Sequence, residues 1–346
     1  MASQLTDDQK STAISWVDFV RFLASFLVVL AHIEAWGAGP GWAQKFFFAI
    51  SRNGVPLFFL ISGHLLLSKQ EDLRTFFRKR AARIIIPFLA WSIIYDVQNS
   101  GAFTESGVTL EAVLKMFLRI LRGPRAGHLW FFYSLIGLYL ITPILRVFIS
   151  KARNSEILYY IALWFIAMPL LFIVEEFTPF KNGFEIYYTG GYLGYFLLGY
   201  YLGRLETKPL LTWAAAGLFI TGILFTFAVF YFDLPPQKNE LVFRSYPSLN
   251  IVLMSLGAFV LIKAAGEEIS ARWAGISSNV SRASFGIYLI HPIVFAWMAF
   301  GWAALGFRTA AGNALLVIPL ATLINFLLSW MIVFLISKIP LVRTVV

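Results

Sequence analysis

Residues 14–34, with the sequence ISWVDFVRFLASFLVVLAHIE, constrain the chain most, because they are long and apolar enough to cross a bilayer yet contain charges. Charged side chains inside a membrane span are costly, so they face a protein interior or a wet cavity and are functional candidates. At about 100° per residue, Asp18, Arg21, Ser25 and His32 fall within a stripe of about 60° on one helix face. Arg21 and His32 are about 16 Å apart along this face. The stripe predicts either a functional site or a polar seam that joins helices.

Composition favours a membrane protein. The chain has 346 residues, of which 59% are hydrophobic and only 13% charged, whereas soluble domains carry about 25% charged residues. We expect an all-α, polytopic transmembrane bundle, with one domain over residues 1–346 and a polar tail at 1–13. The first apolar run is too long for a signal-peptide core, so we expect it to be retained.

Cysteine is absent, which excludes disulfides, a thiolate nucleophile and cysteine-based metal or redox sites. No other metal-ligand motif occurs, so we expect no metal. The net charge of +10 indicates basic cytoplasmic segments rather than nucleic-acid binding.

Hydropathy predicts about ten spans within residues 14–337. Their ranges are 14–34, 46–67, 84–98, 128–149, 156–175, 187–203, 210–232, 246–265, 284–304 and 312–337. With the N-terminus inside, 17 basic residues lie on the cytoplasmic side and 10 on the other, which predicts cytoplasmic N- and C-termini. Residues 108–122 are too short and too charged to span, and their helical periodicity predicts an amphipathic helix at the interface.

A basic cluster follows the second span, in KQEDLRTFFRKRAARIIIPF. Arg78, Lys79, Arg80 and Arg83 stand where the chain re-enters the membrane, and Arg80 and Arg83 are spaced to share a helix face. Two interpretations are compatible with each other. The residues are typical of cytoplasmic topology and lipid headgroup contact, and arginine forks also suit phosphate binding.

Further polar candidates lie in later spans. His128, Trp130 and Tyr133 begin the fourth span at its predicted outer end, where they could form a site or only an aromatic belt. His291 precedes Pro292 in the ninth span, and the proline removes a backbone donor and can bend the helix around a cavity. His291 could line a site or hydrogen-bond another helix.

His32 is the best general base in the sequence, because histidine can take a proton from a hydroxyl near neutral pH. Glu34 follows two residues later and could orient His32, although on an ideal helix it points elsewhere. His64, near the cytoplasmic end of the second span, is interpreted as structural.

These residues and segments resemble the acyltransferase-3 family of bacterial integral-membrane acyltransferases. The family pattern of Arg or Lys, ten residues, then His is matched by Arg21 and His32, and its R-x-x-R by Arg80-Ala-Ala-Arg83. The segments VPLFFLISGHLLL, HLWFFYSLIGLYL, FLLGYYLGR and SFGIYLIHP are also similar, so the resemblance runs from about residue 15 to 295. His64 departs from it, because the family usually has an aromatic residue after this Ser-Gly.

The resemblance implies transfer of an acyl group, most often acetyl from cytoplasmic acetyl-CoA, to a hydroxyl of a cell-surface or lipid-linked glycan. It implies a multi-pass protein of the bacterial inner membrane, of the type without a fused esterase-like domain and without a permanently bound cofactor. The expected partners are acyl-CoA, a carbohydrate such as an exopolysaccharide, and membrane lipid, with a homo-oligomer or a polysaccharide-assembly complex as further options.

On this hypothesis the basic cluster holds the CoA phosphates, and His32 either deprotonates the sugar hydroxyl or is itself acylated. Arg21 would contact polar groups of the donor or pair with Asp18. The residues expected to contact the acceptor or line the site are Glu34, His128, Trp130, Tyr133 and His291.

Two other classes of function remain open at the level of sequence. A glycan transporter or flippase also carries polar residues in its spans, but needs no phosphate cradle for CoA. A non-catalytic partner in a polysaccharide-assembly complex needs no base at His32.

Overall fold

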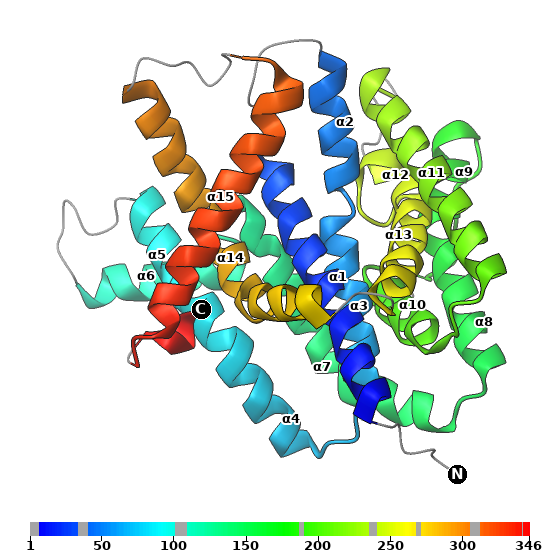
Figure 1. The fold of residues 1–346 in the computed structure, drawn as a ribbon. Coiled ribbons are helices and arrows are strands. Elements are labelled where there is room, and N and C mark those ends of the chain that lie inside the picture. The colour runs from blue at the N-terminus through cyan, green and yellow to red at the C-terminus, as the bar shows by residue number, and fades with distance from the viewer. Residues whose placement is uncertain are drawn as a thin grey trace. The chain divides into compact units, whose positions relative to one another are not determined.

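Helices dominate the computed structural model (Figure 1). The structure describes residues 7–33, 41–100, 109–186, 190–234, 241–267, 271–304, 312–340 and 342–346, and their side chains except at 7–15, 241, 267 and 271–274. No strand occurs among these residues. The predicted all-α class is therefore confirmed.

Nine helical segments in the described part of the chain are long and apolar enough to cross a membrane. They are Trp16–Ile33, Gly41–Leu67, Leu73–Ser100, Gly127–Lys151, Asn154–Phe177, Pro209–Tyr231, Val242–Gly266, Gly275–Ala304 and Ala314–Ser337. Each corresponds to one of the ten predicted spans, so the polytopic architecture is confirmed. The side of the membrane on which the termini lie stays a prediction.

The remaining predicted span, 187–203, contains a shorter helix. Helix α10 covers Leu193–Arg204, and its 12 residues extend only about 18 Å at about 1.5 Å per residue. A bilayer core is about 30 Å thick. Seven consecutive residues of α10, from Gly194 to Tyr200, are buried. The Gly- and Tyr-rich sequence therefore marks a helix packed among others.

The described helices form two compact units. The first comprises Met1–Ser68 and Ile149–Trp330, and the second Lys69–Phe148 and Met331–Val346. The first contains α1 (Asp7–Ile33), α2 (Gly41–Ser51), α3 (Gly54–Leu67), α8 (Asn154–Phe165), the π turn η3 (Ile166–Leu170), α9 (Leu171–Phe177), α10, α11 (Pro209–Tyr231), α12 (Leu241–Arg244), α13 (Leu249–Glu267), α14 (Ala271–Ala304) and most of α15 (Ala314–Ser337).

The second unit begins with one continuous helix. It contains α4 (Leu73–Arg80), the π turn η1 (Ala81–Ile85), α5 (Ile86–Ser100), α6 (Leu110–Arg122), the 3-10 turn η2 (Gly127–Leu129), most of α7 (Trp130–Lys151) and the 3-10 turn η5 (Arg343–Val345). The basic cluster was expected in a loop before a span at 84–98. It lies instead in the first turns of a helix that starts at Leu73, where Asp72 caps the helix by accepting a hydrogen bond from the Thr75 amide at 2.9 Å.

The predicted interfacial helix is present as α6. Thr109 accepts a hydrogen bond from the Ala112 amide at 3.1 Å and so caps its first turn. One side is buried at Met116 and Ile120, while the large apolar side chains that remain exposed are Leu110, Leu114, Phe117, Leu118 and Leu121. The amphipathic helix is confirmed, and its place at the membrane interface stays a prediction.

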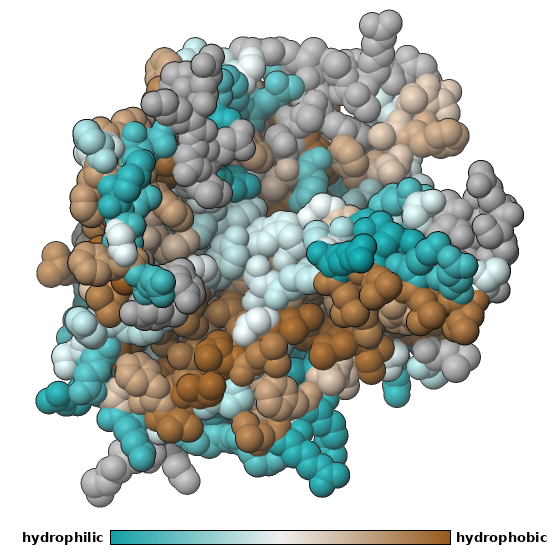
Figure 2. Space-filling view, turned by 180° about the vertical axis from the view of Figure 1, so that it is seen from behind, coloured by the Kyte–Doolittle hydropathy of each residue, from teal (hydrophilic) through white to brown (hydrophobic). Residues whose placement is uncertain are grey.

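Large apolar side chains also cover much of the outer surface of the long helices. Leu140 and Ile144 of α7 and Leu316 of α15 are each more than 60% exposed. Figure 2 shows such apolar side chains gathered over part of one face of the molecule. Surfaces of this kind suit contact with lipid tails rather than water.

Helices α3 and α10 pack almost backbone to backbone in the first unit. A Cβ atom on Gly63 would lie 1.9 Å from the Phe196 carbonyl oxygen, and one on Gly199 would lie 1.8 Å from the Leu60 carbonyl oxygen. Neither position can hold a side chain unless the helix backbones move apart. Small residues permit this close approach, which is a common way for helices to associate in membranes.

We predict that Gly199→Ala lowers the thermal stability of the protein in detergent, because the new methyl group overpacks the contact by about 1–3 kcal/mol. Gly217→Ala in α11 is the matched control, since a Cβ there meets nothing within 4 Å. Its melting temperature should be unchanged or higher, because alanine favours a helix over glycine. Equal melting temperatures for the two variants would contradict the packing described.

Candidate active site

The end of α1 carries the histidine that the sequence predicts to be the general base. His32 lies in the last turn of α1 and is exposed. Its Nδ1 atom is 2.8 Å from the carbonyl oxygen of Val28, one turn earlier. A carbonyl only accepts hydrogen bonds, so Nδ1 carries the proton. The lone pair of neutral His32 is therefore on Nε2.

His291 stands directly behind His32. The Nε2 atom of His291 is 3.2 Å from Nδ1 of His32, and the two rings meet edge to face with centroids 4.7 Å apart. Nδ1 of His291 lies 2.8 Å from the Tyr288 carbonyl oxygen, so by the same reasoning it carries the proton. Nε2 of neutral His291 is then an acceptor for the Nδ1–H group of His32.

The sequence His-Pro explains the orientation of His291. In a regular helix the amide of residue 292 would donate to the carbonyl of Tyr288. Pro292 has no amide hydrogen, so that carbonyl loses its usual donor. The His291 ring supplies a replacement from its Nδ1 atom. The ring is thereby turned so that Nε2 points toward His32.

A second buried contact fixes the backbone at this point. The side-chain amide of Asn325, on α15, donates to the His291 carbonyl oxygen at 3.1 Å. Ser329 donates in turn to the Asn325 side-chain oxygen at 3.2 Å. Asn325, Ser329 and His291 are all fully buried. The exposed imidazole of His32 thus contacts a buried polar network formed by α14 and α15.

The other polar residues of α1 take different positions. Asp18 is 9% exposed and accepts a hydrogen bond from Ser281 of α14 at 2.6 Å. Ser25 donates to carbonyl groups of its own helix, those of Arg21 and Phe22, at 2.9 Å each. Arg21 is half-buried. The polar stripe therefore contains both structural contacts between helices and, at its end, an accessible base. Glu34 lies outside the described residues.

The second unit holds the predicted donor-binding residues. The side chain of Arg80 is only 12% exposed and its Nη2 atom lies 3.5 Å from a carboxylate oxygen of Glu71. The same carboxylate pairs with Lys79 at 2.7 Å and with Arg146 at 3.3 Å. The Lys79 contact is the main cause that lowers the pKa of Glu71 below its ordinary range. Glu71 therefore stays ionised at neutral pH and holds three cations together.

Arg78 and Arg83 differ from Arg80, because both are exposed. A π turn begins at Ala81, so the Ile86 amide bonds to the Ala81 carbonyl, five residues back. The prediction that Arg80 and Arg83 share a face assumed a regular α-helix, in which residues three apart are neighbours. The wider turn changes that spacing, and π turns often mark functional positions. Phosphate binding by these residues stays a prediction.

The predicted acceptor residues of the fourth span have structural contacts. His128 is 6% exposed and its ring packs edge to face on Tyr95 with centroids 5.0 Å apart. Tyr133 is half-buried, and its hydroxyl lies against the carbonyl groups of Ile120 and Gly123 at the end of α6. Trp130 is half-buried at the start of α7. A role of these residues in acceptor binding stays a prediction.

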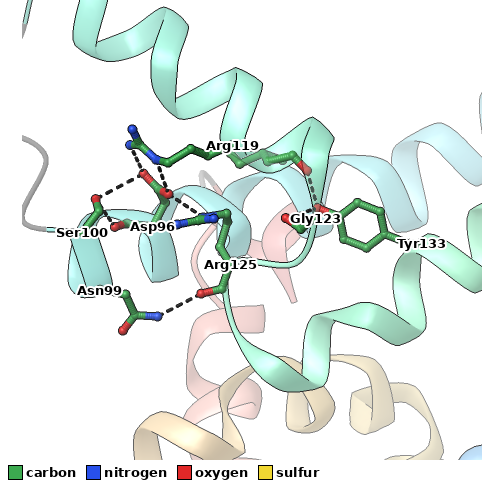
Figure 3. Close-up of polar contacts among 8 residues, drawn as sticks. Asp96, Asn99, Ser100, Arg119, Gly123, Arg125 and Tyr133 are labelled. Atoms are coloured by element: carbon green, nitrogen blue, oxygen red, sulfur yellow. Dashed lines mark hydrogen bonds and ion pairs between the residues drawn. The ribbon is translucent and has the colours of Figure 1, made fainter.

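Figure 3 shows how α6 is fixed to α5 in the same region. Asp96 is fully buried and accepts hydrogen bonds from two arginines, Arg119 of α6 and Arg125 of the following turn, at 2.5 Å and 2.6 Å. Asn99 also donates to the Arg125 carbonyl at 2.9 Å. The buried carboxylate explains two of the four basic residues at 115–125, Arg119 and Arg125, while Lys115 pairs with Glu111 on the exposed side of α6. These two arginines hold α6 and the turn after it against α5.

Sequence reasoning missed one residue, Arg52. It lies between α2 and α3, inside the candidate span Gly41–Leu67, and is half-buried. Its guanidinium has no carboxylate partner among the described residues, and its Nε atom is buried without a hydrogen bond. The available signal was a charge within the predicted span 46–67.

The fold and this site together define a multi-pass α-helical membrane protein in which paired histidines present one accessible imidazole. A comparison with known families then identifies the class of chemistry. The profile of the acyltransferase-3 family, described as an acyltransferase domain, matches residues 14–334. The chain belongs to this family and is a membrane acyltransferase. No functionally curated protein and no solved structure matches the chain.

We predict that neutral His32 carries its proton on Nδ1, as nitrogen-15 NMR of histidine-labelled protein would show. Replacing His291 by phenylalanine removes one of the two acceptors of this proton, while the Val28 carbonyl keeps the other, so Nδ1–H should stay the main form with a larger share of the Nε2–H tautomer than in the wild type. His64→Phe is the control, because His64 packs on Trp16 with ring centroids 5.0 Å apart and has no contact with His32 among those described. A wild-type His32 protonated on Nε2 would refute the assignment.

Proposed function

We propose that the protein is an O-acyltransferase that moves an acetyl or other short acyl group from cytoplasmic acyl-CoA to a hydroxyl of a cell-surface or lipid-linked glycan. The bacterial inner membrane is the proposed location. Membership of the acyltransferase-3 family supports the acyl-transfer part of this proposal. The observation that carries the mechanism is the exposed His32 ring, whose Nδ1 atom is engaged by Val28 and His291.

His32 acts as the general base in this mechanism. Its Nε2 lone pair takes the proton of the sugar hydroxyl while the hydroxyl oxygen attacks the thioester carbonyl carbon. The carbon–sulfur bond then breaks, and the thiolate of CoA takes the proton from Nε2 to leave as the thiol. The ester bond to the sugar is formed and His32 returns to its neutral state. Direct attack of Nε2 on the thioester is the alternative route, with an acyl-histidine intermediate.

His291 supports the charged state of His32 during this cycle. When Nε2 gains a proton the ring becomes a cation, and Nδ1–H remains a donor to the Val28 carbonyl and to Nε2 of His291. Hydrogen bonds to charged groups contribute more than neutral ones, about 1.5–3 kcal/mol. The arrangement resembles other catalytic histidines, in which a third group holds the ring in the productive tautomer.

The donor phosphates bind to the basic cluster at the end of α4 and in η1. Arg78 and Arg83 are exposed and reach the phosphates first. Arg80 is held by Glu71 until a phosphate offers a stronger acceptor, since Arg forks match phosphate geometry. Glu71 thus competes with the donor for Arg80 and keeps this cluster compact in its absence.

We predict that Arg83→Gln weakens acetyl-CoA binding roughly tenfold, the effect of losing one charge-assisted hydrogen bond. Glu71→Gln should tighten binding, because it releases Arg80 and removes a negative charge from the site. Titration calorimetry of the purified protein in nanodiscs measures both. Arg122→Gln is the control, since Arg122 is exposed on α6 and should leave the affinity unchanged. Equal affinities in Arg83→Gln and Arg122→Gln would contradict this donor site.

We predict that His32→Ala retains acetyl-CoA binding but loses CoA release by a factor of about 10²–10⁴, the usual contribution of a general base. Release is followed with a thiol reagent after acetyl-CoA is added, with an acceptor glycan or with water as a slow acceptor. A wild-type protein that binds no acyl-CoA would contradict the proposal and favour a glycan transporter. Unchanged CoA release in His32→Ala would remove His32 from the chemistry.

A further inference from the structure

The junction between α2 and α3 has a definite cause. Pro56 lies in the first turn of α3, and its ring is incompatible with a helical bond to the carbonyl four residues earlier, that of Arg52. The helix accordingly stops at Ser51 and restarts at Gly54. Arg52 therefore lies at a break between two helices, inside an apolar span.

Arg52 lies in a largely aromatic environment. Its guanidinium carbon is 4.0 Å from the ring centroid of Tyr246 and 5.4 Å from that of Phe48. Its Nη2 atom donates to the Arg244 carbonyl at 2.6 Å. Tyr192 stacks on Phe59 with ring centroids 4.6 Å apart. Its hydroxyl interacts electrostatically with the charge of Arg52.

The charge of Arg52 is not neutralised by any carboxylate in the described part of the chain. The nearby Asp233 pairs with Arg244 instead. An uncompensated cation within a membrane span is costly, and such residues are usually functional. The buried Nε–H group adds an unsatisfied donor beside it. An anionic group of a ligand that bound at Arg52 would neutralise the charge and accept a hydrogen bond from the guanidinium.

The α2–α3 junction that carries Arg52 packs against α1. A Cβ atom on Gly54, two residues after Arg52, would lie 3.0 Å from the backbone nitrogen of Val28. Val28 is the residue whose carbonyl holds Nδ1 of His32. The α2–α3 junction therefore contacts the same turn of α1 that orients the proposed base.

We propose that Arg52 and the tyrosines around it bind an oxyanion carried by the acceptor, so that the acceptor is an acidic saccharide. The inference rests on the proposed function, because it identifies the class of its acceptor. Aromatic faces suit the apolar faces of sugar rings, and a guanidinium pairs with a carboxylate or a phosphate. The anion is either a uronic carboxylate of the sugar or the phosphate of a lipid-linked sugar.

Binding measurements in nanodiscs of neutral lipid test this proposal without any need for turnover. The probes form two matched pairs, a short oligogalacturonate with its methyl ester and a polyprenyl phosphate with its polyprenol. We expect at least one acidic probe to bind more tightly than its neutral partner, and added salt to weaken that binding. Preference for the carboxylate indicates an acidic sugar, and preference for the phosphate indicates a lipid-linked one.

Arg52→Gln should weaken the acidic probe about tenfold or more and leave its neutral partner unchanged. Arg52→Lys keeps the charge but lacks the planar fork, so a smaller loss is expected, and this variant decides the result if Arg52→Gln does not fold. Arg153→Gln is the control, because Arg153 is 81% exposed and paired with Glu156.

The proposal is overturned if neither acidic probe binds more tightly than its neutral partner, or if both substitutions of Arg52 leave the affinity unchanged. Acetyl-CoA binding and CoA release on the same preparations report separately on the acyltransferase proposal. Normal CoA release together with no acidic preference would refute the acidic acceptor alone.

Discussion

The site depends on one backbone group, the carbonyl of Tyr288 that Pro292 leaves without an amide donor. In a membrane-spanning helix no water replaces the lost bond, so the group must find a partner within the protein. The His291 ring provides it at 2.8 Å. That requirement turns Nε2 of His291 toward α1, where it is a second acceptor for the Nδ1–H group that the Val28 carbonyl already fixes on His32. The missing backbone hydrogen bond at Pro292 and the orientation of the His291 ring toward His32 therefore have the same cause.

The architecture was largely predictable from the sequence, because spans are set by the length of apolar runs. The exception was the predicted span 187–203, in which the described helix α10 is short and buries Gly194 to Tyr200 among other helices. His32 and His291 could each be recognised as polar groups within spans. Their pairing could not, because 259 residues separate them and only the packing of α1 on α14 brings them together.

The partners of the basic residues could not be predicted from the sequence pattern. The sequence predicts arginines near a membrane surface but says nothing about their partners. Glu71 holds Arg80, Asp96 holds Arg119, and Arg52 has no carboxylate in the described structure. These differences depend on tertiary distances of a few ångströms. They separate cations that are paired with a carboxylate from Arg52, which is not, and that distinction underlies the proposal for the acceptor.

The central claim is that the accessible nitrogen of His32 performs the chemistry. Diethyl pyrocarbonate modifies the accessible unprotonated nitrogen of histidine, and mass spectrometry locates the adduct. The account predicts that His32 is modified faster than the buried His291, that acetyl-CoA protects it, and that CoA release is lost in proportion to its modification. Full modification of His32 with undiminished CoA release would contradict the account.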